Sequence, residues 1–153
     1  MQNFLNYVYN PFLLTGLLSW IIAQFLKLVI HTIIYKKFEI SRLFGDGGMP
    51  SGHSATVVSL ATVTALGCGV SSFEFAVTAI LAIIVCHDAM GVRRETGKQA
   101  VIINEIIESF NVFATEKLPE TKLKEFVGHT PIQVLSGALI GIANAVIMYF
   151  ILF

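Results

Sequence analysis

Three polar stretches interrupt an otherwise apolar chain, and together they contain the residue types that phosphoryl chemistry needs. They are GDGGMPSGHSA at 45–55, HDAMGVRRETGKQA at 87–100 and EFVGHTPIQVLSG at 125–137. His53 and His129 are candidates for nucleophilic attack and proton transfer. Arg93 and Arg94 can hold a tetrahedral oxyanion through charge-assisted hydrogen bonds. Each feature alone is also typical of an ordinary turn or a juxtamembrane charge, so the prediction of a phosphoryl site depends on their convergence.

Two of these stretches also predict the N-terminus of a helix, where free backbone amides form an anion-binding site. In the first, Pro50 suits the first turn of a helix, and the Ser51 hydroxyl would add a hydrogen-bond donor. In the last, Thr130 is typical of a cap residue and Pro131 of a first turn. His129 would then lie just outside the second of these helix ends.

Two further charged residues are expected to support this site. Lys27 lies inside an apolar segment, so we expect it to face the protein interior, within reach of the same phosphoryl group. Asp88 ends another apolar segment, and we expect a salt bridge between it and Lys27 or one of the two arginines. Zinc bound by His53, His129 and Asp88 is the rival interpretation. No close pair with the spacing of HxxxH supports it, so we predict neither a metal nor another cofactor.

The composition is that of a membrane protein. Of the 153 residues, 55% are apolar and only 13% are charged, and the mean hydropathy is +0.75. Average soluble domains contain roughly 25% charged residues. The formal net charge is zero, so no overall field would attract nucleic acid, and we expect no nucleic-acid partner. The length indicates a single membrane domain over residues 1–153.

A membrane-spanning helix needs about 20 mostly apolar residues. Four segments approach that length, at about 12–35, 50–67, 73–90 and 131–153. The second is shorter and rich in small residues, which favours close helix packing. The last contains Gly137 and Gly141, a GxxxG pair that also indicates packing. We therefore expect an all-α integral membrane bundle of about four spanning helices.

The segment at 91–130 is too long to be a simple connection. Within it, one helix face is shared by Ile103, Ile106, Ile107 and Phe110, which predicts an amphipathic helix. That helix would lie on the membrane surface or against a partner subunit. A helix packed on the protein's own core is the equally supported alternative. A chain with so few spans is also compatible with a homodimer.

The distribution of cations predicts the topology. Nine of the ten Lys and Arg residues fall between the first and second spans or within 91–130. Under the positive-inside rule these two segments are cytoplasmic, which puts both termini outside. The three polar stretches then meet at the cytoplasmic face of the membrane, which we expect to be a bacterial plasma membrane.

These motifs resemble the type 2 phosphatidic acid phosphatases, which share an all-helical core with vanadium-dependent haloperoxidases. PSGH at 50–53 is similar to the central motif of that family, and GHTPIQVLSG at 128–137 is similar to its last motif. The order GGMPSGHSA, DAMGVRR and GHTPIQV resembles the divergent bacterial and plant branch, related to acid phosphatases and haloperoxidases. The resemblance covers nearly the whole chain from Gln24 onward.

The resemblance implies a role for each matching residue. His129 matches the nucleophile that forms a phosphohistidine intermediate, and His53 matches the general acid that protonates the leaving oxygen. Lys27 matches the lysine of the first motif. Ser51 and Gly52 match phosphate-binding positions.

The chain departs from the family pattern at three places. The Arg-Pro of the first motif is missing, and Lys36 or Lys37 is only a loose substitute. Leu123 occupies the position of the last motif's arginine, so we expect Arg93 or Arg94 to replace it. Gln133 stands where the family has an aspartate. The Gln133 carbonyl oxygen can accept the ring N–H of His129 one turn away, but it cannot supply the negative charge that stabilises an imidazolium.

Two hypotheses about function follow. The first is a metal-independent phosphatase that hydrolyses a lipid or prenyl phosphate or pyrophosphate through a phosphohistidine. The alternative is a non-catalytic binder or carrier of phosphorylated lipids on the same fold, which Gln133 and the missing arginine favour. A small transporter or channel subunit has less support, since only Lys27 and the GxxxG face indicate it.

Overall fold

The computed structural model describes residues 10–40, 47–113, 122–123 and 128–153, and every regular element in them is a helix. The bounds are α2 Pro11–Tyr35, α3 Gly52–Cys68, α4 Phe73–Met90, α5 Val92–Phe113 and α6 Pro131–Leu152. The expected all-α fold class is therefore confirmed. Helices α2, α3, α4 and α6 lie over the four apolar segments of the sequence.

Polar side chains determine where four of these helices begin. The side-chain oxygen of each cap residue accepts a hydrogen bond from a backbone amide of the first turn, which would otherwise lack an intrahelical partner. The caps are Asn10, Ser51, Ser72 and Thr130. Because Ser51 is the cap of α3, Pro50 lies before the helix, and the expectation that Pro50 occupies its first turn is wrong.

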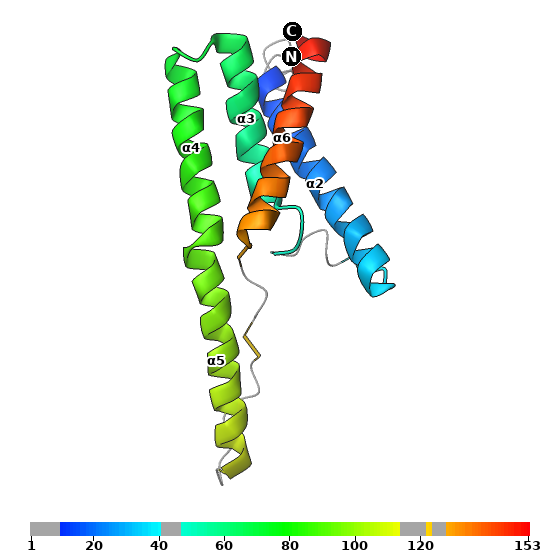
Figure 1. Ribbon diagram of the computed structural model, residues 1–153, viewed down its shortest axis with the longest axis vertical. Coiled ribbons are helices and arrows are strands. Elements are labelled where there is room, and N and C mark those ends of the chain that lie inside the picture. The colour runs from blue at the N-terminus through cyan, green and yellow to red at the C-terminus, as the bar shows by residue number, and fades with distance from the viewer. Residues whose placement is uncertain (1–9, 41–46, 114–121, 124–127) are drawn as a thin grey trace, which may run out of the picture.

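Helix α3 lies at the centre of the bundle and packs against α2, α4 and α6 (Figure 1). Its closest approach is to α6. A Cβ atom added to Gly137 would overlap the Ser51 carbonyl oxygen, and one added to Gly141 would overlap the Ala55 carbonyl oxygen. The GxxxG face of α6 therefore packs within this chain, and it brings the two backbones into direct contact along the first turns of α3.

A buried polar contact joins α6 to α2. Asn144 Nδ2 donates hydrogen bonds to Ser19 Oγ at 2.7 Å and to the Thr15 carbonyl oxygen at 3.3 Å. All three residues are buried. Such hydrogen bonds stabilise membrane helix pairs by about 0.6 kcal/mol each on average, so this contact helps to fix the angle between the two helices.

Three helical runs are long and apolar enough to cross a membrane: Pro11–Tyr35, Phe73–Asn111 and Pro131–Leu152. The fourth apolar helix, α3, has 17 residues and falls just short of that length. Because α3 is surrounded by the other three helices, its ends do not have to reach both lipid–water interfaces. Where about four spanning helices were expected, the described residues therefore contain three of sufficient length and a fourth apolar helix that is short and central.

Helix α5 continues the direction of α4 beyond the end of the bundle, with Gly91 between them (Figure 1). Among the helices that the structure describes, α5 contacts α4 alone. Ile103, Ile106 and Phe110 are exposed, so packing on the protein's own core is not observed in the described residues. Contact of this face with the membrane surface or a partner subunit stays a prediction.

Candidate functional site

The three polar stretches meet at the end of the bundle where α3 and α6 begin and α4 passes into α5. Two backbone hydrogen bonds join them. The Ser51 amide donates to the Gln133 carbonyl oxygen at 3.0 Å, and the His129 amide donates to the Ala89 carbonyl oxygen at 2.9 Å. The start of α3 is thus fixed to the first turn of α6, and the residue before Thr130 is fixed to the last turn of α4.

His53 and His129 lie beside each other at this junction. Their ring centroids are 6.3 Å apart, and the ring planes cross at 82°. His129 is only 3% exposed, whereas His53 is exposed. The buried ring therefore lies at the base of the junction, and the exposed ring lies in the first turn of α3 on its open side.

Gly128 brings His129 to this position. Its φ of +85° lies in the left-handed region, which glycine adopts without steric cost. A Cβ atom at Gly128 would overlap the backbone of Arg94 at the start of α5. The chain therefore passes directly over the first turn of α5, which places His129 next to the side chains of that turn.

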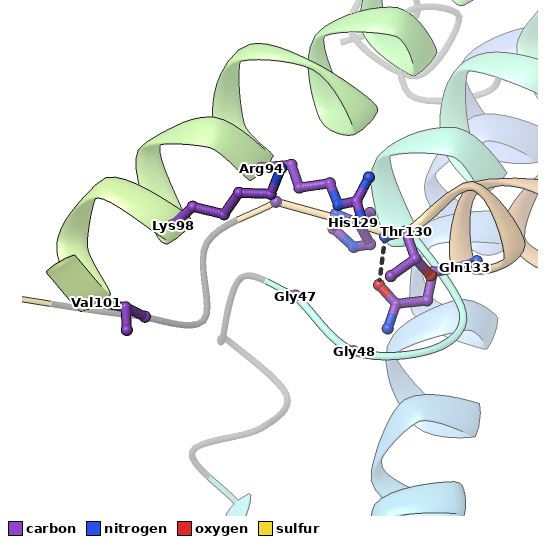
Figure 2. Close-up of a pocket in the computed structure, with 10 residues that line it drawn as sticks. Gly47, Gly48, Arg94, Lys98, Val101, His129, Thr130 and Gln133 are labelled. Atoms are coloured by element: carbon purple, nitrogen blue, oxygen red, sulfur yellow. Dashed lines mark hydrogen bonds between the residues drawn. The ribbon is translucent and has the colours of Figure 1, made fainter.

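A cavity of about 280 Å³ opens beside His129. Figure 2 shows α5 on one side of it, the start of α6 on the other, and the 47–48 segment across from them. The polar side chains and glycines that line it include Gly47, Gly48, Arg94, Lys98, His129 and Gln133. The cavity thus combines two cations, an imidazole and two glycines that allow a ligand to approach the backbone closely.

The structure separates the roles of the two arginines. Arg94 lines the cavity with His129, but Arg93 does not belong to the described lining. Instead, Arg93 Nε donates to Asp88 Oδ2 at 2.7 Å. Successive residues of an α-helix point about 100° apart, so neighbouring side chains face different surroundings. Arg94 is therefore the candidate for phosphate binding, and Arg93 is the cation that pairs with Asp88.

Three predicted phosphate-binding residues, Lys27, Ser51 and Gly52, are not among the residues that line the described cavity. Lys27 is buried, and its aliphatic chain lies 3.6 Å from where a Cβ of Gly48 would be. Ser51 is buried, and its Oγ accepts hydrogen bonds from the amide and hydroxyl of Ser54. Gly52 packs against the Trp20 ring, which lies 3.3 Å from where a Cβ atom of Gly52 would be. Direct phosphate binding by the three residues stays a prediction.

Gln133 makes a different contact from the expected one. Its Oε1 accepts a hydrogen bond from the Thr130 amide at 3.0 Å, while the Gln133 amide donates to Thr130 Oγ1 at 3.4 Å. This reciprocal pair is a capping box, and a threonine followed three residues later by a glutamine is its sequence signature. The TPIQ sequence carries that signal, and a second hydrogen bond from the His129 ring to the same oxygen stays a prediction.

Lys98 is the cavity residue that the sequence analysis missed. It follows Arg94 by four residues on α5, and residues at this spacing lie on one helix face. Once Arg94 is placed in the cavity, the sequence RRETGK at 93–98 predicts that Lys98 lies on the same helix face.

The zinc interpretation requires Asp88 to turn toward the histidines, but its carboxylate is bonded to Arg93. Within the described ranges, no group of three or more His, Cys, Asp or Glu side chains is close enough to hold a metal ion. The donor set that this interpretation needs is therefore not assembled among these residues.

The fold and this cavity define a helical membrane protein with a cationic, histidine-containing site at one end of its bundle. The chain belongs to the Divergent PAP2 family, whose model matches residues 8–144. It is 45% identical over 148 residues to the uncharacterized membrane protein YuiD of Bacillus subtilis strain 168, a match that covers 90% of this chain and 94% of that protein. No solved structure matches the chain. The resemblance stated from the motifs is thereby confirmed at the level of the family.

Proposed function

We propose that this membrane protein hydrolyses a lipid or prenyl phosphate or diphosphate, with His129 as the nucleophile and His53 as the general acid. The observation that carries the proposal is the separation of 6.3 Å between the two ring centroids, next to the cavity that Arg94 lines. Two contacts of about 3 Å, one from each ring, can meet at a single phosphoryl group over such a distance.

The reaction proceeds in two steps. A ring nitrogen of His129 forms a bond to phosphorus, and the bond from phosphorus to the leaving oxygen breaks. That oxygen belongs to the lipid in a monophosphate and to the remaining phosphate in a diphosphate. The electron pair of the broken bond stays on the leaving oxygen, which takes a proton from the His53 imidazolium. Water then attacks phosphorus while neutral His53 accepts a proton of the water. The bond between phosphorus and the His129 nitrogen breaks, its electron pair returns to the ring, and inorganic phosphate leaves.

Electrostatics at the cavity favour this chemistry. Arg94 presents a planar fork of donors that can hold two phosphoryl oxygens at once, and Lys98 adds a second positive charge. The burial of His129 removes water from one side of the reacting group, which strengthens these interactions relative to bulk solvent.

The substrate class follows from where the site lies. The cavity is at the end of a bundle whose outer helices expose large apolar side chains along their length, such as Phe25 of α2, Ile84 of α4 and Leu135 of α6. A substrate with an acyl or prenyl chain can therefore keep that chain in the bilayer while its phosphate enters the cavity. The cation count favours a cytoplasmic site, with both termini outside.

A non-catalytic binder or carrier of phosphorylated lipids is the second candidate. The observation that favours it is the capping box, because the Gln133 side chain is engaged with Thr130 and carries no charge. An imidazolium at His129 would receive no stabilising carboxylate from this position. The cavity cations would still bind a phosphate group without turnover.

Trapping of the covalent intermediate separates these candidates. The purified protein in lipid nanodiscs is mixed with lipid phosphate labelled in its phosphoryl group, and label that is stable in base and labile in acid is measured on the protein. We expect such label in the wild-type chain and its loss in His129→Ala. The control variant is His87→Ala, which removes an exposed histidine at the end of α4.

Label that persists in His129→Ala would exclude His129 as the nucleophile. Lipid binding without any label or phosphate release would favour the carrier. Gln133→Asp supplies a further comparison, since a rise in turnover in this variant would agree with a hydrolytic site that lacks one negative charge.

A further inference from the structure

We infer that the cavity binds a diphosphate group, with one phosphate between Arg94 and His129 and the second at Lys98. This inference deepens the proposed function, because it rests on the same phosphate site and narrows the ligands of that site. It concerns binding alone, so it does not depend on turnover.

The two cations lie on one side of the cavity. Arg94 and Lys98 are four residues apart on α5, and side chains at this spacing lie about 6 Å apart at their Cβ atoms on one helix face. Both line the cavity (Figure 2). Gly97, which precedes Lys98 on the same helix, also lines the cavity and is buried. A ligand held by Arg94 at His129 therefore has a second cation one helical turn farther along α5.

The cavity has room for a diphosphate as well as for a single phosphate. A cavity holds one water molecule from about 10–15 Å³ upward, so the seven oxygen atoms of a diphosphate need on the order of 100 Å³ on the same scale. The volume of about 280 Å³ exceeds this requirement. Gly47 and Gly48 line the wall opposite α5, and as glycines they have no side chains that would fill the space.

Lys98 can leave its present partner. Its Nζ lies 2.6 Å from Glu95 Oε1, but both side chains are more than half exposed, at 55% and 58%. Ion pairs at such exposure stabilise a protein by at most about 1 kcal/mol. A phosphate with its larger negative charge competes well with one carboxylate for this ammonium group. Glu95 itself does not belong to the described cavity lining.

The test compares the binding of methylenediphosphonate and methylphosphonate, which share phosphonate chemistry and are not hydrolysed. Dissociation constants are measured by calorimetry on the full chain in detergent. We expect the wild-type protein to bind the diphosphonate about ten-fold more tightly, the effect of one additional charge-assisted hydrogen bond. In Lys98→Met that preference should fall below two-fold, with less than a three-fold change for methylphosphonate. Lys98→Arg should restore most of the preference.

Glu95→Gln is the matched control, because it breaks the same ion pair and keeps the cation. We expect it to bind the diphosphonate at least as tightly as the wild-type chain does. A loss equal to that of Lys98→Met would overturn the inference, since the ion pair and not the cation would then be responsible. Equal wild-type affinity for the two probes would also overturn it, as would a Lys98→Met variant that weakens both equally.

Competition identifies the source of the diphosphate. Farnesyl diphosphate and free pyrophosphate are each used to displace the diphosphonate probe. If farnesyl diphosphate displaces the probe at the lower concentration, the natural ligand is a lipid-borne diphosphate. If free pyrophosphate does so, the natural ligand is a free diphosphate. Both results keep the two-phosphate assignment. Selective diphosphonate binding without phosphohistidine refutes hydrolysis and leaves this inference intact. Phosphohistidine formation without a preference for the diphosphonate refutes this inference and leaves the proposed hydrolysis intact.

Discussion

Arg93 and Arg94 are adjacent in the sequence, but their substitution should affect different properties of the protein. Arg94 lines the cavity with His129, whereas Arg93 is bonded to Asp88 at 2.7 Å on the outer surface of the helix. The variants Arg94→Met and Arg93→Met therefore make the same substitution at neighbouring positions. Only the direction of the side chain differs between the two variants.

The expected magnitudes follow from these surroundings. Removal of one preorganised donor to a transition-state oxyanion typically costs 10²–10³ in kcat, and we expect a loss of about this size for Arg94→Met. The Arg93–Asp88 side chains are 47% and 40% exposed, so this pair contributes at most about 1 kcal/mol to stability. For Arg93→Met we expect a change in kcat of less than about three-fold, from the loss of one nearby charge.

The assay is the initial rate of phosphate release from a lipid phosphate in nanodiscs, with thermal unfolding measured in parallel to show that both variants are folded. Arg94→Lys should recover only part of the rate, because an ammonium group lacks the planar fork of a guanidinium. A loss in Arg93→Met as large as that in Arg94→Met would refute the separation of roles. In a chain without turnover, the same order should appear in the dissociation constants for methylphosphonate.

Three other substitutions test the geometry of the bundle and of the site. Gly141→Ala should lower the free energy of unfolding by about 1–3 kcal/mol, because its Cβ would overlap the Ala55 carbonyl oxygen. Gln133→Ala should cost about 1 kcal/mol of stability through the loss of the capping box with Thr130, and Gln133→Glu should retain that stability. His53→Ala should slow phosphohistidine formation by about 10²–10⁴, measured by rapid quench.

Each of these predictions has a control. Ala143→Val adds volume to the exposed face of α6 and should leave unfolding nearly unchanged, in contrast to Gly141→Ala. A Gln133→Glu protein as unstable as Gln133→Ala would show that the capping box does not stabilise α6. If His53→Ala forms phosphohistidine at the wild-type rate, then His53 is not the general acid of the first step.

The helices themselves could be predicted from the sequence. Apolar runs of about 20 residues are required wherever a helix crosses a bilayer, so α2, α4 and α6 follow from composition and length. The convergence of the polar stretches was also predictable. Two successive spans return the chain to the face from which it started, so the segments before α3 and α6 and after α4 share one face. The observed contacts of Ser51 with Gln133 and of His129 with Ala89 agree with this.

What only the tertiary structure decided is the direction of individual side chains. The sequence could not choose between Arg93 and Arg94, because the rotation of α5 about its axis depends on contacts with α4 and with the chain at Gly128. The four-residue spacing relates Lys98 to Arg94, but without that choice of arginine the sequence could not place Lys98 in the cavity, whose 47–48 wall comes from a distant segment.

The same distinction explains the role of Gln133 and the GxxxG face. From the sequence, Gln133 has two possible partners within one turn, the His129 ring and the Thr130 amide, and the structure shows its oxygen bonded to the Thr130 amide. From the sequence, Gly137 is equally compatible with helix packing within one chain and between two chains. In the structure it contacts the Ser51 backbone of the same chain. Local patterns determine which groups are available, whereas competition among neighbours in three dimensions determines which of them meet.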